Sequence, residues 1–139
     1  MKKFSFRLQK VLEYREMVES WAKEAYLDAR TARLEAEVSL LGIESRRQEM
    51  LREPVGGLDG RLNLQARLQK LDDQETEKRT ILQVLIAEEE RSLAEWTEKR
   101  LELEALQKLK EKALEEWKIE AQRYEQAELD EWAVLRRAA

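Results

Sequence analysis

Apolar residues recur at alternating steps of three and four from about Phe4 to Arg52. All positions of this first seam except Arg15 and Ser39 are apolar. The seam consists of Phe4, Leu8, Val11, Arg15, Val18, Ala22, Ala25, Ala29, Ala32, Ala36, Ser39 and Ile43. This spacing predicts an amphipathic helix with heptad character over about 4–52. Because the middle of the seam is nearly all alanine, a partner helix can approach closely there or fill the space with large side chains.

A second, weaker pattern runs from about Arg61 almost to the end of the chain. Its best seam begins Leu64, Leu68, Leu71 and continues through polar as well as apolar positions, while Leu93 and Leu101 fall outside it. A straight helix drifts against a strict heptad repeat, so an apolar stripe of this kind widens or moves around the helix. The pattern predicts a helix over about 61–137 and leaves its register open.

The segment between the two patterns, "EPVGGLDG" at residues 53–60, holds the single proline and three of the four glycines. Proline disrupts a helix interior and glycine supplies flexible or left-handed backbone. The segment therefore predicts a turn at 53–60 that joins the helices into an antiparallel coiled-coil hairpin. Folding about this turn places position i opposite roughly 114 − i, with the alanine stretch 22–36 facing "ILQVLI" at 81–86.

The two predicted helices differ in length, so the second should overhang the first. About 29 residues, Glu111 to Ala139, are expected to lack a partner within the chain. This overhang carries many apolar residues, namely Trp117, Ile119, Tyr124, Leu129, Trp132, Val134 and Leu135. Exposed apolar surface of this extent on a helix indicates an interaction site, a crystal-contact seam or a frayed end, and we favour the interaction site. The sequence thus predicts an all-α protein with one coiled-coil domain over 1–139 and an interaction surface near its ends.

Composition excludes several classes of function. Charged residues make up 40% of the chain, the mean hydropathy is -0.74 and the net charge is -4, which argues against general nucleic-acid binding. With no histidine and no cysteine, histidine acid–base catalysis, thiol chemistry and the common zinc sites are ruled out. "GGLDG" lacks the features of a phosphate loop, and "EEE" at 88–90 fits a solvated helix face. We expect no enzyme activity, cofactor or metal.

Two further expectations concern membranes and the start of the chain. No apolar run reaches the length of about 18 residues that a membrane-spanning helix needs, so no transmembrane segment is expected. Lys2, Lys3, Arg7 and Lys10 all precede the first acidic residue, Glu13. Positive charge at a helix N-terminus opposes the helix dipole. A basic start that is tolerated despite this suggests an acidic partner surface.

The two ends of the chain resemble a known family. "KFSFRLQKVLEYRE", residues 3–16, is similar to the start of the flagellar export protein FliJ family, with aromatic-x-aromatic, then Leu, Val-Leu and Arg-Glu. "RYEQAELDEWAVLRR", residues 123–137, is similar to the closing helix of that family. The middle of the chain would match many coiled coils, so the resemblance depends on these end motifs.

The resemblance implies a non-enzymatic component of the bacterial flagellar type III export apparatus. Members of the family form an antiparallel coiled coil similar to the central stalk of rotary ATPases. Their partners are the flagellar export ATPase hexamer, whose assembly and activity they promote, the cytoplasmic domain of the export gate, and export chaperones. The implied location is the cytoplasm, peripheral to the flagellar basal body and inner membrane.

Carried over to this chain, the resemblance assigns residues at both ends to the ATPase. The N-terminal set is Phe4, Arg7, Leu8 and Val11, and the C-terminal set is Gln126, Leu129, Asp130, Trp132 and Arg136. Contact with the export gate is assigned to Leu68, Leu71, Gln74 and Lys78, early on the second helix. Two alternatives stay open, a stalk protein of a virulence-type secretion system and a generic coiled-coil scaffold.

Overall fold

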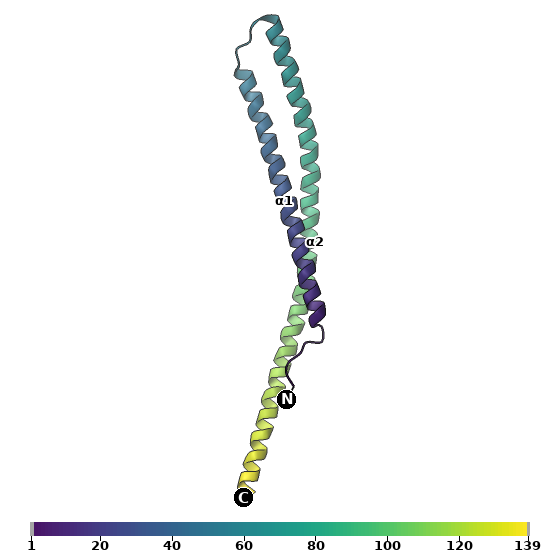
Figure 1. The fold of residues 1–139 in the computed structure, drawn as a ribbon, viewed down its shortest axis with the longest axis vertical. Coiled ribbons are helices and arrows are strands. Elements are labelled where there is room, and N and C mark those ends of the chain that lie inside the picture. The colour runs from purple at the N-terminus through teal and green to yellow at the C-terminus, as the bar shows by residue number, and fades with distance from the viewer. Residues whose placement is uncertain (1, 139) are drawn as a thin grey trace. The chain divides into compact units, whose positions relative to one another are not determined.

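The computed structural model describes residues 2–138, so the two terminal residues of the predicted domain, Met1 and Ala139, lie outside the described part. The described residues form two helices and no strand, α1 (Gln9–Arg52) and α2 (Gly57–Ala138) (Figure 1). The helices pack against each other in antiparallel fashion, which confirms the predicted all-α hairpin with a longer second helix.

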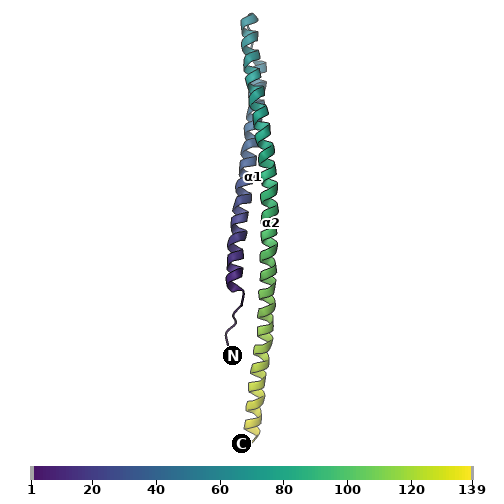
Figure 2. The same ribbon diagram turned by 90° about the vertical axis from the view of Figure 1, so that its right-hand side faces the viewer.

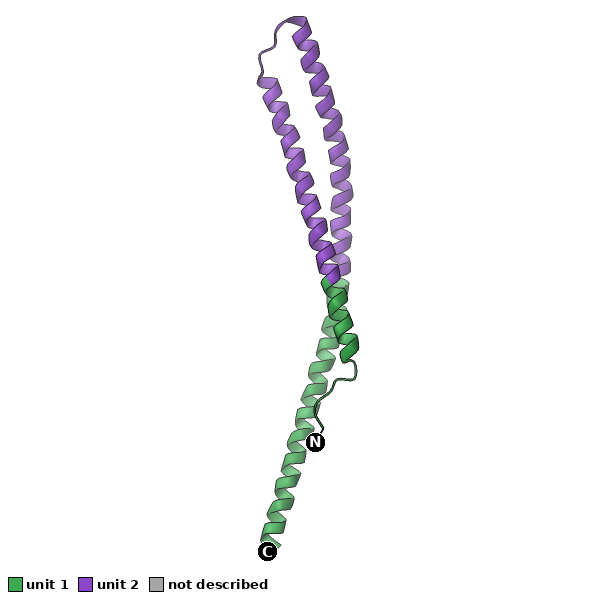
Figure 3. Ribbon diagram, in the orientation of Figure 1, with its two compact units in different colours: residues 1–20, 97–139 green, residues 21–96 purple. Residues whose placement is uncertain are grey.

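The chain divides into two compact units, each with segments of both helices (Figure 3). Unit 1 combines the N-terminal residues up to Ser20 with the C-terminal residues from Thr97 onward. Unit 2 is the continuous segment Trp21–Trp96, which contains the bend. The single domain expected over 1–139 stays a prediction.

The first helix begins at Gln9, later than the start near Phe4 that the apolar pattern predicted. The residues before it lie along α2 outside any helix and end in a turn at Arg7 and Leu8. They are held there because the carbonyl of Lys2 accepts a hydrogen bond of 3.1 Å from the indole N–H of Trp117 and the Phe4 ring packs on the same indole. Keeping Lys2 and Lys3 outside the helix also removes positive charge from its dipole-positive end. Phe4 and Leu8 of the predicted seam are half-buried, but Val11 is exposed and Leu12, outside the seam, is buried in its place.

The bend is shorter than predicted, since α2 already begins at Gly57 rather than near residue 61. Gly57 has a φ of 65°, the single positive φ among the described residues, and the Gly60 N–H donates to the Gly56 carbonyl at 3.2 Å as the helix starts. A left-handed residue at this point lets the chain leave the extended segment around Pro54 and enter the helix. Of the glycines in the bend, Gly57 is therefore the one whose backbone conformation requires glycine.

Replacing Gly57 by alanine is expected to reduce the free energy of unfolding by about 1 kcal/mol, because an L-residue in the left-handed region is strained. Gly56→Ala is the matched control. Its added Cβ would meet no atom within 4 Å and its φ is not positive, so this variant should be neutral or slightly more stable. Urea unfolding followed by circular dichroism measures both, and equal effects of the two substitutions would contradict the role given to Gly57.

Within unit 2, the two helices pair in a register different from the predicted one. Arg33 of α1 hydrogen-bonds Glu89 of α2, whereas the prediction put residue 33 near residue 81. The true pairing is thus displaced by about two helical turns along α2. Tyr26 accordingly stacks on Trp96, with ring centroids 5.5 Å apart and an interplanar angle of 23°. The alanine-rich stretch lies opposite the segment around Glu89 and Trp96 instead of "ILQVLI".

The displacement has its cause in the bend. The connection from Arg52 to Gly57 is not a tight reversal but runs alongside the first turns of α2, where Glu53 forms an ion pair of 3.0 Å with Arg67 (Figures 1 and 2). The first turns of α2 therefore extend beyond the end of α1. Ile43 and Leu71, both almost fully buried, form the centre of the apolar contact in this unit.

Within unit 1, Leu12 and Leu103 are the buried apolar pair, and Arg15 forms an ion pair of 2.5 Å with Glu102 beside them. The N-terminal segment then follows α2 as far as Trp117. The stretch without a partner therefore starts later than the predicted Glu111.

Candidate interaction surfaces

The last turns of α2 in unit 1 expose large apolar side chains on several sides of the helix. Leu129, Trp132, Val134 and Leu135 are each about two-thirds exposed, and from Gln122 to Ala138 every residue is exposed. We call these four residues the terminal aromatic surface. Monomeric proteins rarely leave contiguous apolar surface of this kind uncovered unless it binds something.

Polar groups border the terminal aromatic surface. The Arg136 guanidinium lies 5.1 Å from the centroid of the Trp132 ring, a cation–π arrangement that limits the motion of both side chains. One turn earlier, the Gln126 side-chain amide donates to Asp130 at 3.2 Å. The surface therefore offers an aromatic ring, a guanidinium and a carboxylate close together on one helix, a combination typical of protein–protein binding sites.

The N-terminal segment covers a neighbouring part of α2 in the same unit. Phe4 meets Trp117 edge to face, with ring centroids 6.1 Å apart and an interplanar angle of 62°. The residues lining the shallow groove between the segment and the helix come from both sides. They are Lys2, Lys3, Phe4, Trp117, Ala121, Tyr124, Glu125 and Glu128. Two lysines of the N-terminal segment thus lie beside two glutamates of α2. These opposite charges favour the placement of the basic segment on α2, so no partner protein is needed to explain it.

The residues assigned to the ATPase from the sequence all belong to unit 1. In the N-terminal set, Phe4 and Leu8 are half-buried while Arg7 and Val11 are exposed. The whole C-terminal set, Gln126, Leu129, Asp130, Trp132 and Arg136, is exposed. Phe4 packs against Trp117 of α2, and the C-terminal set lies further along the same helix, so the structure brings both ends of the sequence to one unit.

Sequence reasoning did not assign a role to the residues that anchor the N-terminal segment. The sequence marks Trp117 and Tyr124 as apolar residues of the overhang. It does not identify Trp117 as the partner of Phe4, nor Tyr124, Glu125 and Glu128 as residues that line the groove beside the N-terminal segment. A signal was available, because Trp117, Ala121 and Tyr124 follow the same three-and-four spacing as the seam of a paired helix.

The residues assigned to the export gate lie in unit 2 and differ in accessibility. Lys78 is exposed, Leu68 and Gln74 are half-buried, and Leu71 is only 4% exposed. Gln74 and Lys78 line a groove between the two helices together with Glu77 of α2 and Ser39, Gly42, Ile43 and Arg46 of α1. Leu71 instead belongs to the core that supports this groove.

Charged residues between the helices of unit 2 are paired. The hydrogen bonds that Glu75 accepts from Arg47 and from Arg79 lower the pKa of its carboxyl group, and their charges add to this. Hydrogen bonds to Glu89 and Glu37 raise the pKa of Arg33 in the same way. These pKa shifts favour the ionised forms of Glu75 and Arg33, as expected of structural ion pairs.

These features define an all-α protein built as an antiparallel helical hairpin, with exposed apolar surface on its longer helix. Among the described residues, no helix combines the length and the apolar character that crossing a membrane requires. The chain matches the model of the family described as "Flagellar FliJ protein" over residues 4–138, nearly its whole length, and it belongs to that family. The resemblance seen in the end motifs is thereby confirmed.

Membership makes the protein a component of the flagellar export apparatus, in which the FliJ family is a non-catalytic part. Searches of curated proteins and of solved structures found no match to the chain.

Proposed function

We propose that this chain is the stalk component that binds the hexameric flagellar export ATPase through unit 1 and promotes assembly and hydrolysis by that ring. The terminal aromatic surface is the observation on which the proposal depends. Four large apolar side chains exposed on one helix end are unfavourable in water and are well suited to burial inside a ring of subunits.

Within this surface, Trp132 and Leu129 are the anchors that would enter apolar pockets of the ATPase. Arg136, held against Trp132, and Asp130, held by Gln126, would supply charged contacts at the rim. Arg7 and Val11 are exposed on the N-terminal side of unit 1 and would extend the contact. Phe4 and Leu8, which are half-buried, would act by holding the N-terminal segment on α2.

A single chain bound inside a sixfold ring cannot contact all subunits equally. It therefore favours those subunit arrangements that bind it best, and a ligand shifts a conformational equilibrium by the difference in its affinity for the competing states. Different faces of α2 would bind different subunits of the ring. This binding would stabilise the assembled ring and would couple the hydrolytic states of its subunits to one another.

The cytoplasmic domain of the export gate is the second proposed partner. The proposed contact is the groove containing Gln74 and Lys78, together with Leu68, which lines a separate groove nearer the bend; the buried Leu71 would act from the core. Export chaperones are proposed as further partners on exposed faces of the hairpin, and the protein would act in the cytoplasm beside the basal body and inner membrane.

The proposal is tested by adding the purified protein to a flagellar export ATPase and measuring both hydrolysis and co-elution in size-exclusion chromatography. We expect stimulated hydrolysis and a shift of the ATPase to the hexamer. A virulence-type export ATPase assayed in parallel distinguishes the two export systems, because the family predicts a preference for the flagellar enzyme. Neither stimulation nor co-elution with the flagellar enzyme would overturn the proposal.

A further inference from the structure

The apolar contact between α1 and α2 in unit 2 does little to define one register. Ala29, Ala32 and Ala36 provide small, similar side chains on α1, and the residues of α2 on their level include several leucines. Small side chains on one helix accept large ones from the other at many relative positions. Sliding the helices by a turn or a heptad would keep much of this apolar contact.

Two arginines interrupt the apolar contact, and each meets a carboxylate of the opposite helix. Arg33 holds Glu89 with two nitrogens, its Nε and, at 3.3 Å, its Nη2. Its Nη1 donates to Glu37 of its own helix at 2.9 Å. The side chains of Arg33 and Glu89 are only 22% and 16% exposed. Two-point recognition of a carboxylate is strongly dependent on geometry, so this pair fixes relative position as well as charge.

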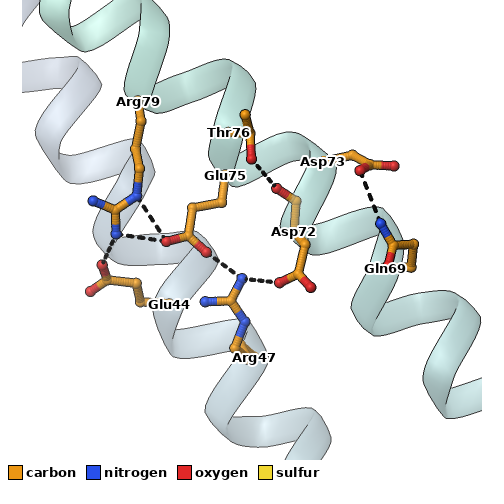
Figure 4. Close-up of polar contacts among 8 residues, drawn as sticks. All are labelled: Glu44, Arg47, Gln69, Asp72, Asp73, Glu75, Thr76 and Arg79. Atoms are coloured by element: carbon orange, nitrogen blue, oxygen red, sulfur yellow. Dashed lines mark hydrogen bonds and ion pairs between the residues drawn. The ribbon is translucent and has the colours of Figure 1, made fainter.

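The second arginine, Arg47, lies at the centre of a larger network (Figure 4). Its guanidinium donates to Asp72 at 2.6 Å and also to Glu75, whose side chain is 14% exposed. Arg79 then links Glu75, at 2.6 Å, to Glu44 of α1, at 3.5 Å. Asp72, Glu75 and Arg79 of α2 thus bind Glu44 and Arg47 of α1. The partly buried carboxylate of Glu75 lies at the centre of this network.

A slip of the helices by four or seven residues breaks both arginine contacts together, and a slip by three residues still breaks that of Arg33, which would then meet Ile86 or Ser92. A four-residue shift in one direction brings Arg33 to Leu85 and Arg47 to Leu71. In the other direction it brings Arg33 to Leu93 and Arg47 to Arg79. A seven-residue shift sets Arg33 against Leu82 or Trp96 and Arg47 against Leu68 or Leu82. Each alternative leaves partly buried charges without their partners, which is strongly unfavourable.

We propose that Arg33 with Glu89, and Arg47 with Glu75, form a polar register lock that selects one alignment of α1 and α2. The lock specifies the alignment by penalising all others and adds little stability of its own. Its consequence is that Ser39, Gly42 and Arg46 come to lie beside Gln74, Glu77 and Lys78, so that the composite groove between the helices exists only in this alignment.

The register can be measured directly, because the chain has no cysteine and accepts spin labels at chosen sites. Cysteines introduced at Glu35 and Lys70, which are exposed and lie in unit 2, would carry the labels. These positions are offset along the helix axis, so a slip of one turn changes the label distance by about 5 Å. Pulsed electron paramagnetic resonance on dilute protein resolves such a change within one molecule.

The decisive variant replaces both pairs by leucine, as Arg33→Leu, Glu89→Leu, Arg47→Leu and Glu75→Leu together. Substituting partly buried ion pairs by apolar residues is often neutral or stabilising, so this variant should unfold at the same or higher urea concentration. Its distance distribution, however, should split into populations separated by about 5 Å. A single distance equal to that of the parent chain would overturn the proposal.

A matched control and a second variant complete the test. Arg91 and Glu88 form an exposed pair within α2, 2.6 Å apart, and replacing both by leucine should leave the single distance unchanged. If the four-leucine variant does not fold, Arg33→Glu with Arg47→Glu is measured instead. It should lose the parent distance, and adding Glu89→Arg with Glu75→Arg should restore it. Retention of the parent distance by the glutamate variant would also overturn the lock.

Discussion

Trp132→Ala is expected to weaken binding to the flagellar export ATPase by about thirtyfold or more, the loss of roughly 2 kcal/mol or more typical of a central aromatic anchor. The Trp132 ring is 60% exposed in this chain, so its area is free to be buried by a partner. Arg136, which rests on this ring, would also lose its support. Stimulation of hydrolysis should fall in parallel with affinity.

Because Trp132 makes few contacts within the chain, the substitution should leave the urea midpoint unchanged, and loss of binding can then be attributed to the surface. Val84→Ala is the control, since Val84 is similarly exposed, at 65%, but lies in unit 2. Titration calorimetry with the ATPase measures both variants. Equal affinities for the parent chain and Trp132→Ala would remove the terminal aromatic surface from the proposed site.

The existence of the two helices and of the bend could be predicted because each depends on local chemistry. Three-and-four spacing of apolar residues, and a proline beside glycines, act within a few residues of where they occur. The family also followed from the two end motifs. In contrast, the start of α1 depends on Trp117, more than a hundred residues away, whose indole binds the Lys2 carbonyl. Local propensity contains no information about that contact.

The register was mispredicted because a symmetrical turn was assumed. The length of the path from Arg52 to Gly57 is set by an extended segment and by the Glu53–Arg67 ion pair, neither of which the apolar pattern describes. The seam of α1 did contain the necessary information, since Arg15 interrupts it and Arg33 and Arg47 lie beside it. Matching these arginines to glutamates of the second helix would have favoured the observed alignment over the predicted one.

The same reasoning explains which site residues could be anticipated. Exposed aromatic residues in an overhang are visible in the sequence as soon as the helix lengths are known. Whether an apolar residue such as Leu71 faces a partner or the core depends on the register, and an error of two turns is enough to change the answer. The exposure of the C-terminal set proposed for the ATPase could therefore be anticipated without the register, whereas the accessibility of the residues proposed for the gate could not.

Ile43→Ala is expected to cost about 2–4 kcal/mol of unfolding free energy, the usual range for removing a buried aliphatic side chain. Ile43 is 3% exposed, and the described part of unit 2 has only one other almost fully buried apolar residue, Leu71. Domains of this size are stable by about 5–15 kcal/mol, so the loss is a large share of the total.

Val38→Ala provides the comparison, because Val38 lies on the same helix but is 68% exposed, and its truncation should change stability by no more than about 0.5 kcal/mol. Urea unfolding monitored by helical circular dichroism gives both values, provided that the slope with denaturant is unchanged. A cost for Ile43→Ala as small as that for Val38→Ala would mean that charge pairing rather than apolar burial holds the helices of unit 2 together. The four-leucine variant, which removes the charges and adds apolar surface, would then unfold more easily than the parent chain instead of resisting urea at least as well. The two measurements together therefore separate the source of stability in this hairpin from the source of its alignment.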